Sequence, residues 1–297
     1  DLHAWYRMTL LRLIDLCRFV SSKHTRDHVR RCLPQNCGYI LDELLHAHFE
    51  DHDKDQYYGE IIESIIRYDR ADAYIIRFCE VIKRLAVDRL HIVGDLFDRG
   101  PRPDRILDSL MAHHQVDIQW GNHDVVWMGA AAGSPLCIMT VLKTTLAYNN
   151  LDTLEGGYGL RRLERFAQHT YADSDVSRWL PHADQRTAAG DLTAAARMHK
   201  AVTVMMLKLE AQVIARNPDF DLQGRDFLNH IDFAAGTVDY FGTTYPLLDC
   251  DFPTVDPANP AALTADEEKI AAELVRSFAE SERLQRHVQF LYAHGAF

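Results

Sequence analysis

One stretch of the chain, residues 86–132, alternates strand-like runs with helical patterns, and this alternation constrains the fold more than any other feature. Residues 86–93 and 116–120 are short β-leaning runs, and they end at Gly94 and Gly121. A helical pattern follows each run. Because a right-handed crossover places two such strands side by side, we predict an α/β fold in which they are parallel neighbours.

The segments on either side of this βαβα unit are mainly helical. We predict a helical segment at 1–85, a core that carries the chemistry at 86–150, and a helical region at 151–297 with a small β-hairpin near 231–246. The expected helices cover residues 5–20, 25–32, 39–49, 57–68, 74–85, about 104–114 with Asp104 as N-cap, 160–169, 193–214, and about 264–292, where Thr264 and Glu267 fit a capping box.

Composition indicates a folded protein, because 47% of the 297 residues are hydrophobic and 25% are charged. The net charge of −11 repels phosphate backbones, which argues against nucleic acid as a partner. The six cysteines form no Cys-x-x-Cys pair, so we expect mostly reduced, buried thiols. No apolar run reaches the ~18 residues of a membrane span and no leader pattern opens the chain, so we expect a cytoplasmic protein without a membrane partner.

Both strand-like runs are followed by polar residues suited to metal-dependent chemistry. Asp95, Asp98 and Arg99 follow the first run, and Asn122 and His123 follow the second. Ligands gather beyond the carboxyl ends of parallel strands, so we expect these side chains to share one edge. Such donors suit Mn²⁺, Mg²⁺, Fe²⁺ or Zn²⁺, and a metal pair can activate water for phosphoester hydrolysis. Arg99 could clamp the phosphate, and His123, oriented by Asp98, could protonate the leaving alkoxide.

The two segments, Gly-Asp-Leu-Phe-Asp-Arg-Gly at 94–100 and Gly-Asn-His-Asp at 121–124, resemble the metallophosphoesterase signature. That resemblance implies that Asp95 bridges two metals and that Asn122 binds the second one. It also implies that His123 is the general acid, that Asp98 pairs with it, and that Arg99 binds phosphate.

Over a wider span, residues 88–106 and 116–130 look similar to the class III fructose-1,6-bisphosphatases of bacteria. The resemblance implies part of a metallophosphoesterase βαβ core with large helical additions. It further implies hydrolysis of fructose 1,6-bisphosphate to fructose 6-phosphate and phosphate in gluconeogenesis, with a small phosphorylated sugar as substrate and a dinuclear Mn²⁺ site. Mg²⁺ or another divalent ion stays open as the metal, and a homo-oligomer stays open as the assembly.

The resemblance also implies an Asp-x-His motif after an earlier strand and two later histidines beside glycines. Residues 1–3 spell Asp-Leu-His, but a helical pattern begins there, so we reject them as that motif. His294-Gly295 ends a helical pattern rather than a strand, and we reject it too. Asp95 and Asn122 would then be two of six ligands, so we expect a piece of a longer chain that is nearly inactive alone.

Several other assignments compete with this one. The chain could belong to another metallophosphoesterase, such as a protein Ser/Thr phosphatase or a dinucleoside polyphosphate hydrolase, or it could be a regulatory or scaffold piece without catalysis. Asp124 suits an N-cap of the following helix better than a metal ligand. His91 lies within the first strand-like run, and we expect it to be buried or half-buried.

Overall fold

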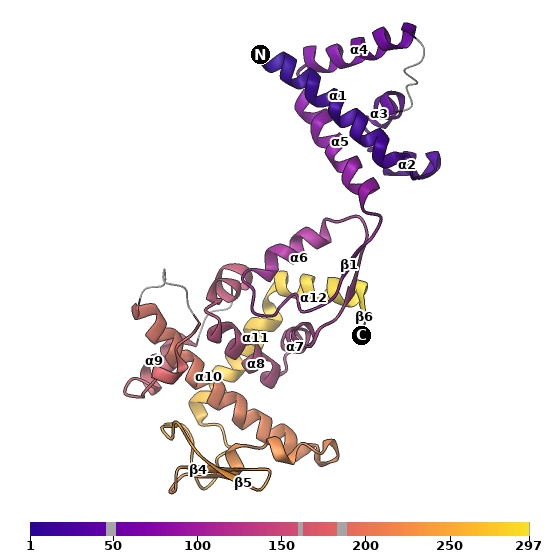
Figure 1. Ribbon diagram of the computed structural model, residues 1–297. Coiled ribbons are helices and arrows are strands. Elements are labelled where there is room, and N and C mark those ends of the chain that lie inside the picture. The colour runs from indigo at the N-terminus through magenta and orange to yellow at the C-terminus, as the bar shows by residue number, and fades with distance from the viewer. Residues whose placement is uncertain (46–51, 160–162, 183–188, 297) are drawn as a thin grey trace. The chain divides into compact units, whose positions relative to one another are not determined.

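The computed structural model describes residues 1–45, 52–159, 163–182 and 189–296 of the chain. The chain divides into two compact units, Asp1–Leu90 and His91–Phe297 (Figure 1). Each unit has a hydrophobic core made from its own residues. No helix in the described ranges combines the length and the apolar character needed to cross a bilayer.

The first unit is helical, as the periodicity predicts. Asp1 caps its first helix by accepting a hydrogen bond from the His3 amide at 3.1 Å, and Thr25 caps the second. Phe78, Val81 and Leu85 recur at helical spacing and are buried in the core of this unit. The helices are α1 (Leu2–Ser21), α2 (Arg26–Cys32), α3 (Gly38–Leu45), α4 (His52–Arg67) and α5 (Ala71–Ala86). The end of the helix expected at 39–49 lies outside the described residues.

The strand–helix alternation is present in the order expected: β1 (Leu90–Ile92), α6 (Pro103–Met111), β2 (Val116–Gln119) and α7 (Asn122–Ala131). The two strands are neighbours in a three-stranded sheet of order β1-β2-β6, where β6 (Gly295–Ala296) runs parallel to β2. The first strand is shorter than predicted, because α5 continues through Ala86 on the buried face that ends at Leu85.

Helices of the second unit lie beside this sheet (Figure 1). The final helix is broken, contrary to the prediction of one helix over 264–292. Ser281 adopts an extended conformation, and its hydroxyl donates to the Tyr158 carbonyl at 2.9 Å. The Thr264–Glu267 capping box is confirmed. The helices are α8 (Pro135–Ala147), α9 (Glu164–Thr170), α10 (Ala189–Arg216), α11 (Ala265–Glu280) and α12 (Glu282–His294), with a π-helical turn at Thr153–Gly157 and 3₁₀ turns at Ser177–Trp179, Pro218–Phe220, Gln223–Arg225 and Leu228–His230.

The predicted hairpin is present as a second small sheet. Its three antiparallel strands are β3 (Ile231–Asp232), β4 (Thr237–Tyr240) and β5 (Thr243–Pro246). Val238 pairs with Ile231 on one side and with Tyr245 on the other. The turn between β4 and β5 contains Gly242 at φ 76°, a conformation that glycine adopts at little cost.

The six cysteines are all free, as expected, but the expectation that most are buried is wrong. Only Cys17 is buried; Cys250 is exposed and the other four are half-buried. Burial in the first core raises the pKa of the Cys17 thiol to about 12.

Candidate functional site

The candidate site lies on the two loops that follow β1 and β2. Gly94 and Asp95 both have positive φ, 92° and 54°, so the chain turns sharply as it leaves β1. A side chain at Gly94 would come within 2.7 Å of the Gln119 carbonyl oxygen, and one at Gly121 would overlap the Asp95 carboxylate. The glycines therefore let two strand ends and one carboxylate approach closely.

Asp124 joins the two loops. Its carboxylate is fully buried and accepts hydrogen bonds from three backbone amides: Asp95 at 2.8 Å, Phe97 at 3.3 Å and Gly121 at 3.0 Å. The prediction that Asp124 is the N-cap of α7 is wrong, because Gly121 is the N-cap and Asp124 is the third helical residue. In that position its carboxylate reaches back over the helix start, where an acidic group is also stabilised by the helix dipole.

The two predicted metal ligands stand on the loops that come together at this edge. The Asp95 carboxylate accepts a hydrogen bond from the His123 amide at 3.2 Å. It also occupies the position where a side chain at residue 121 would begin, which is available because that residue is Gly121. Asn122 stands between Gly121 and His123 in the chain and is the first residue of α7. Asp95 and Asn122 are both exposed, so both oxygen donors are open to solvent and to an ion.

The remaining predicted residues form a chain of contacts beside Asp95. His123 Nε2 lies 3.0 Å from Asp98 Oδ1, and Arg99 Nε lies 3.5 Å from the same oxygen. The His123 side chain is 26% exposed and that of Arg99 is 63% exposed, so the imidazole is held in place while the guanidinium is free to meet a ligand. The expected pairing of Asp98 with His123 is therefore present in the structure.

Two residues that hold Arg99 carry no assigned role in the sequence analysis. The Arg99 guanidinium lies 5.2 Å from the centre of the Tyr148 ring, a cation–π distance. The Asn150 amide donates to the Arg99 carbonyl at 2.6 Å. Both follow α8, about fifty residues away in sequence, and no local pattern connects them with Arg99.

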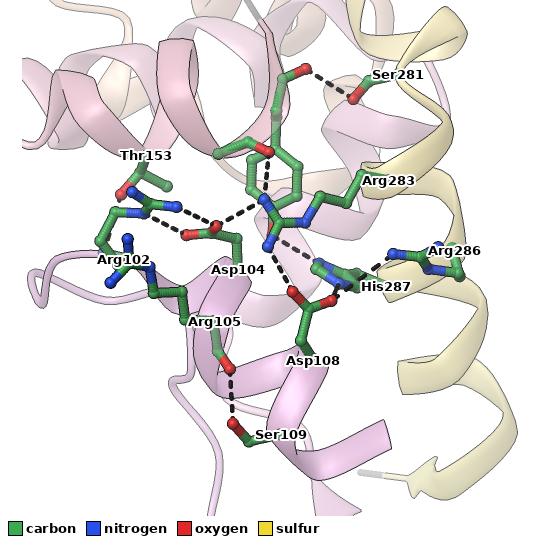
Figure 2. A network of polar contacts seen from close by, with 12 residues as sticks. Arg102, Asp104, Arg105, Asp108, Ser109, Thr153, Ser281, Arg283, Arg286 and His287 are labelled. Atoms are coloured by element: carbon green, nitrogen blue, oxygen red, sulfur yellow. Dashed lines mark hydrogen bonds and ion pairs between the residues drawn. The ribbon is translucent and has the colours of Figure 1, made fainter. Parts of the chain in front are cut away.

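Behind the Asp98–Arg99 loop, a polar network fixes α6 against α12 (Figure 2). Asp104 is fully buried, and Arg102 and Arg283 lie 2.7 and 2.8 Å from its Oδ2. Figure 2 shows Arg283 between Asp104 and Asp108, with His287 on the far side of Asp108. The prediction that Asp104 caps α6 is wrong, because Arg102 holds the N-cap position and Asp104 is its buried ion-pair partner.

The ionisation states in this network follow from its contacts. Burial alone would raise the pKa of the Asp104 carboxyl, but the hydrogen bond from Arg102 and the charge of Arg283 lower it overall. Hydrogen bonds from His287 and Arg283 lower the pKa of Asp108. Burial lowers the pKa of His287 in spite of the neighbouring Asp108 carboxylate.

Two histidines, His3 and His294, belong to the segments that were rejected above as family motifs. His3 is on α1 beside Glu63, at 2.9 Å. His294 is the last residue of α12, as expected, and the short strand β6 begins directly after it. Gly295 pairs with Ile118, in the second half of β2. His91 is also not buried as expected: it is exposed and pairs with Asp117 across β1 and β2.

The structure defines the class as a mixed α/β protein, mostly helical, with two small sheets. The chain belongs to the family described as Firmicute fructose-1,6-bisphosphatase, which it matches over residues 1–297.

Curated relatives carry the name fructose-1,6-bisphosphatase class 3. The chain is 47% identical over 300 residues to one from Alkaliphilus metalliredigens and to one from Clostridium beijerinckii, and 46% identical to one from Listeria monocytogenes. The whole chain takes part in each match, but it spans only 45% of the first two relatives and 46% of the third. No solved structure matches the chain.

Proposed function

We propose that the protein carrying this sequence hydrolyses fructose 1,6-bisphosphate to fructose 6-phosphate and phosphate, as a cytoplasmic step of gluconeogenesis. The observation that carries the proposal is the contact chain at one strand edge, in which His123, Asp98 and Arg99 lie beside the exposed carboxylate of Asp95. We take the substrate from the names of the relatives and the type of reaction from the residues at this edge.

A divalent metal fits this edge. Asp95 and Asn122 offer exposed carboxylate and amide oxygens, the donors that Mn²⁺ and Mg²⁺ prefer, and we assign Mn²⁺ on the family resemblance. Bound ions of this kind activate water and neutralise phosphoryl oxygens. Asp124 already fixes the backbone of both loops, which keeps the loops that carry Asp95 and Asn122 next to each other.

The chain's own residues account for phosphate binding and for proton transfer. Arg99 presents an exposed guanidinium that can bind two phosphate oxygens, and Tyr148 and Asn150 keep it at the site. His123 Nε2 lies 3.0 Å from Asp98 Oδ1, so the carboxylate can orient the ring. The other ring nitrogen, Nδ1, is then the one that gives a proton to the leaving sugar oxygen.

Replacing His123 in a complete protein that contains this sequence tests the proposal. His123→Ala should lower phosphate release from fructose 1,6-bisphosphate with Mn²⁺ by about 10² to 10⁴-fold, because general acid catalysis is lost. His113→Ala is the matched control, since it removes another histidine, whose ring contacts its sequence neighbours His114 and Gln115. Equal turnover by the two variants, or preferential hydrolysis of a phosphoprotein or a dinucleoside polyphosphate, would contradict the proposal.

The chain of 297 residues by itself should be a poor catalyst. Two neutral-to-acidic oxygen donors hold a metal pair weakly in water, so we expect phosphate release from fructose 1,6-bisphosphate far slower than that of the longer protein. A colorimetric phosphate assay on both proteins with Mn²⁺ compares them directly. Comparable turnover numbers would show that the remaining donors lie within residues 1–297.

A further inference from the structure

Three potential metal ligands converge in the first unit, which contains none of the catalytic candidates. They are His24, His28 and Asp88, and each offers a ligand atom within 4.8 Å of the others. Among the residues that the structure describes, this is the one such group. We propose that these three side chains bind a divalent transition-metal ion, with Zn²⁺ as the best fit and water in the fourth position.

The distances suit one ion. Asp88 Oδ1 lies 3.7 Å from His24 Nε2 and 3.9 Å from His28 Nε2. Ligand atoms around a tetrahedral zinc are ~3.4 Å apart, because each bond is about 2.1 Å long. A contraction of a few tenths of an ångström would bring Asp88 Oδ1 to this spacing from both histidine nitrogens, which themselves lie within 4.8 Å of each other. Two imidazoles and one carboxylate form a donor set that favours zinc over magnesium or calcium.

The local fold holds the two histidines ready. Thr25 caps α2 by accepting from the His28 amide at 3.3 Å, which places His24 and His28 one turn apart. Their rings stack with centres 4.7 Å apart. Lys23 donates to the Ala86 carbonyl at 3.3 Å and brings the segment before α2 to the end of α5, two residues before Asp88. Ion binding therefore requires little further ordering of these side chains.

The contacts of the free site also show what an ion would change. His24 Nε2 lies 2.8 Å from the Leu85 carbonyl, so this nitrogen carries a proton, which must move to Nδ1 before Nε2 can bind a metal. Cys32 Sγ lies 3.8 Å from His28 Nε2 but outside the group of three, so we assign it no bond to the ion. The site is open to solvent, since the Asp88 side chain is 60% exposed.

A bound ion would connect three parts of the first unit: the turn before α2, α2 itself, and the segment between α5 and β1. Asp88 lies in that last segment, seven residues before Asp95 in the chain. The ion would therefore act as a structural clip on the segment that leads into the candidate site, and it is distinct from any ion held by Asp95 and Asn122.

Zinc titration of the chain with a competing chromophoric chelator tests the proposal. The wild-type chain should bind Zn²⁺ at this site, and Asp88→Asn and His28→Ala should each weaken that binding by more than about tenfold. Asp88→Asn changes an exposed side chain, and circular dichroism checks that both variants stay folded. The wild-type chain, but not Asp88→Asn, should also gain thermal stability from Zn²⁺.

Three further variants decide where the ion binds. His3→Ala is the matched control, because His3 is another first-unit histidine beside a carboxylate, Glu63. It should bind Zn²⁺ as the wild type does, and so should Asp95→Asn and Cys32→Ser. Binding that is lost in Asp95→Asn or in Cys32→Ser but kept in Asp88→Asn would overturn the proposal, as would a wild-type chain that takes no Zn²⁺ from the chelator.

Discussion

The buried carboxylate of Asp124 determines where the candidate ligands lie, although it is not itself one of them. Asp124→Asn keeps the shape but turns one acceptor into a donor that faces backbone N–H groups. We expect a loss of about 3 kcal/mol in the free energy of unfolding, measured by urea denaturation. Asp219→Asn, at an exposed aspartate, should change it by less than about 0.5 kcal/mol. Equal effects of the two variants would contradict this role for Asp124.

His287 should make the stability of the second unit depend on pH. Its pKa in the folded protein is lowered from 6.5 by burial, in a setting where Asp108, Arg283, Arg286 and Tyr158 surround the ring. The unfolded chain therefore binds a proton first, and stability falls as the pH drops below about 6.5.

We expect His287→Gln, which keeps a donor toward Asp108, to show a flatter dependence of the thermal midpoint on pH between about 7 and 5. His113→Gln, at a half-buried histidine outside this network, should keep the wild-type slope. The lowered pKa values of Asp104 and Asp108 act at more acid pH, where both variants should lose stability alike. A wild-type slope in His287→Gln would show that the ring does not titrate in this window.

At the scale of single residues, the sequence predicts the site residues that directly follow a strand, but it does not predict the contacting residues that are far away in the chain. Asp95, Asp98, Arg99, Asn122 and His123 are predictable because glycines and polar residues directly follow two β-leaning runs. Tyr148, Asn150 and Arg283 reach the same region from later helices and turns, and only tertiary packing brings them there.

At the scale of elements, a buried lysine joins the long helix α10 to α11. Lys208 and Glu267 are both fully buried and lie 2.7 Å apart, which joins α10 to the start of α11. Lys208→Met should lower the free energy of unfolding by about 3 to 5 kcal/mol, because it leaves a buried carboxylate without its partner. The double variant Lys208→Met/Glu267→Gln should recover part of that loss. Urea denaturation measures both, with the exposed Lys269→Met as control.

If the double variant is no more stable than Lys208→Met, the charge on Glu267 is not the source of the loss.

The order of the helices is easier to predict from the sequence than the residues at which they end. Apolar periodicity predicts α10 and α11, whereas the break at Ser281 depends on a hydrogen bond to Tyr158, 123 residues earlier. No apolar pattern between 264 and 292 marks that residue, so sequence alone predicts one continuous helix.

At the scale of the whole molecule, the described residues form two units with separate cores, and the sequence pattern anticipates a change near residue 85. Phe78 in the first core and Phe278 in the second are both 0% exposed, so the two positions can be compared directly by substitution. Phe78→Ala should destabilise the first unit by about 3 to 5 kcal/mol, and Phe278→Ala should do the same to the second. Because neither core contains residues of the other unit, each variant should leave the other unit's stability unchanged. Hydrogen exchange read by mass spectrometry along a urea series distinguishes the units, and loss of protection in both units with either variant would show that they unfold as one.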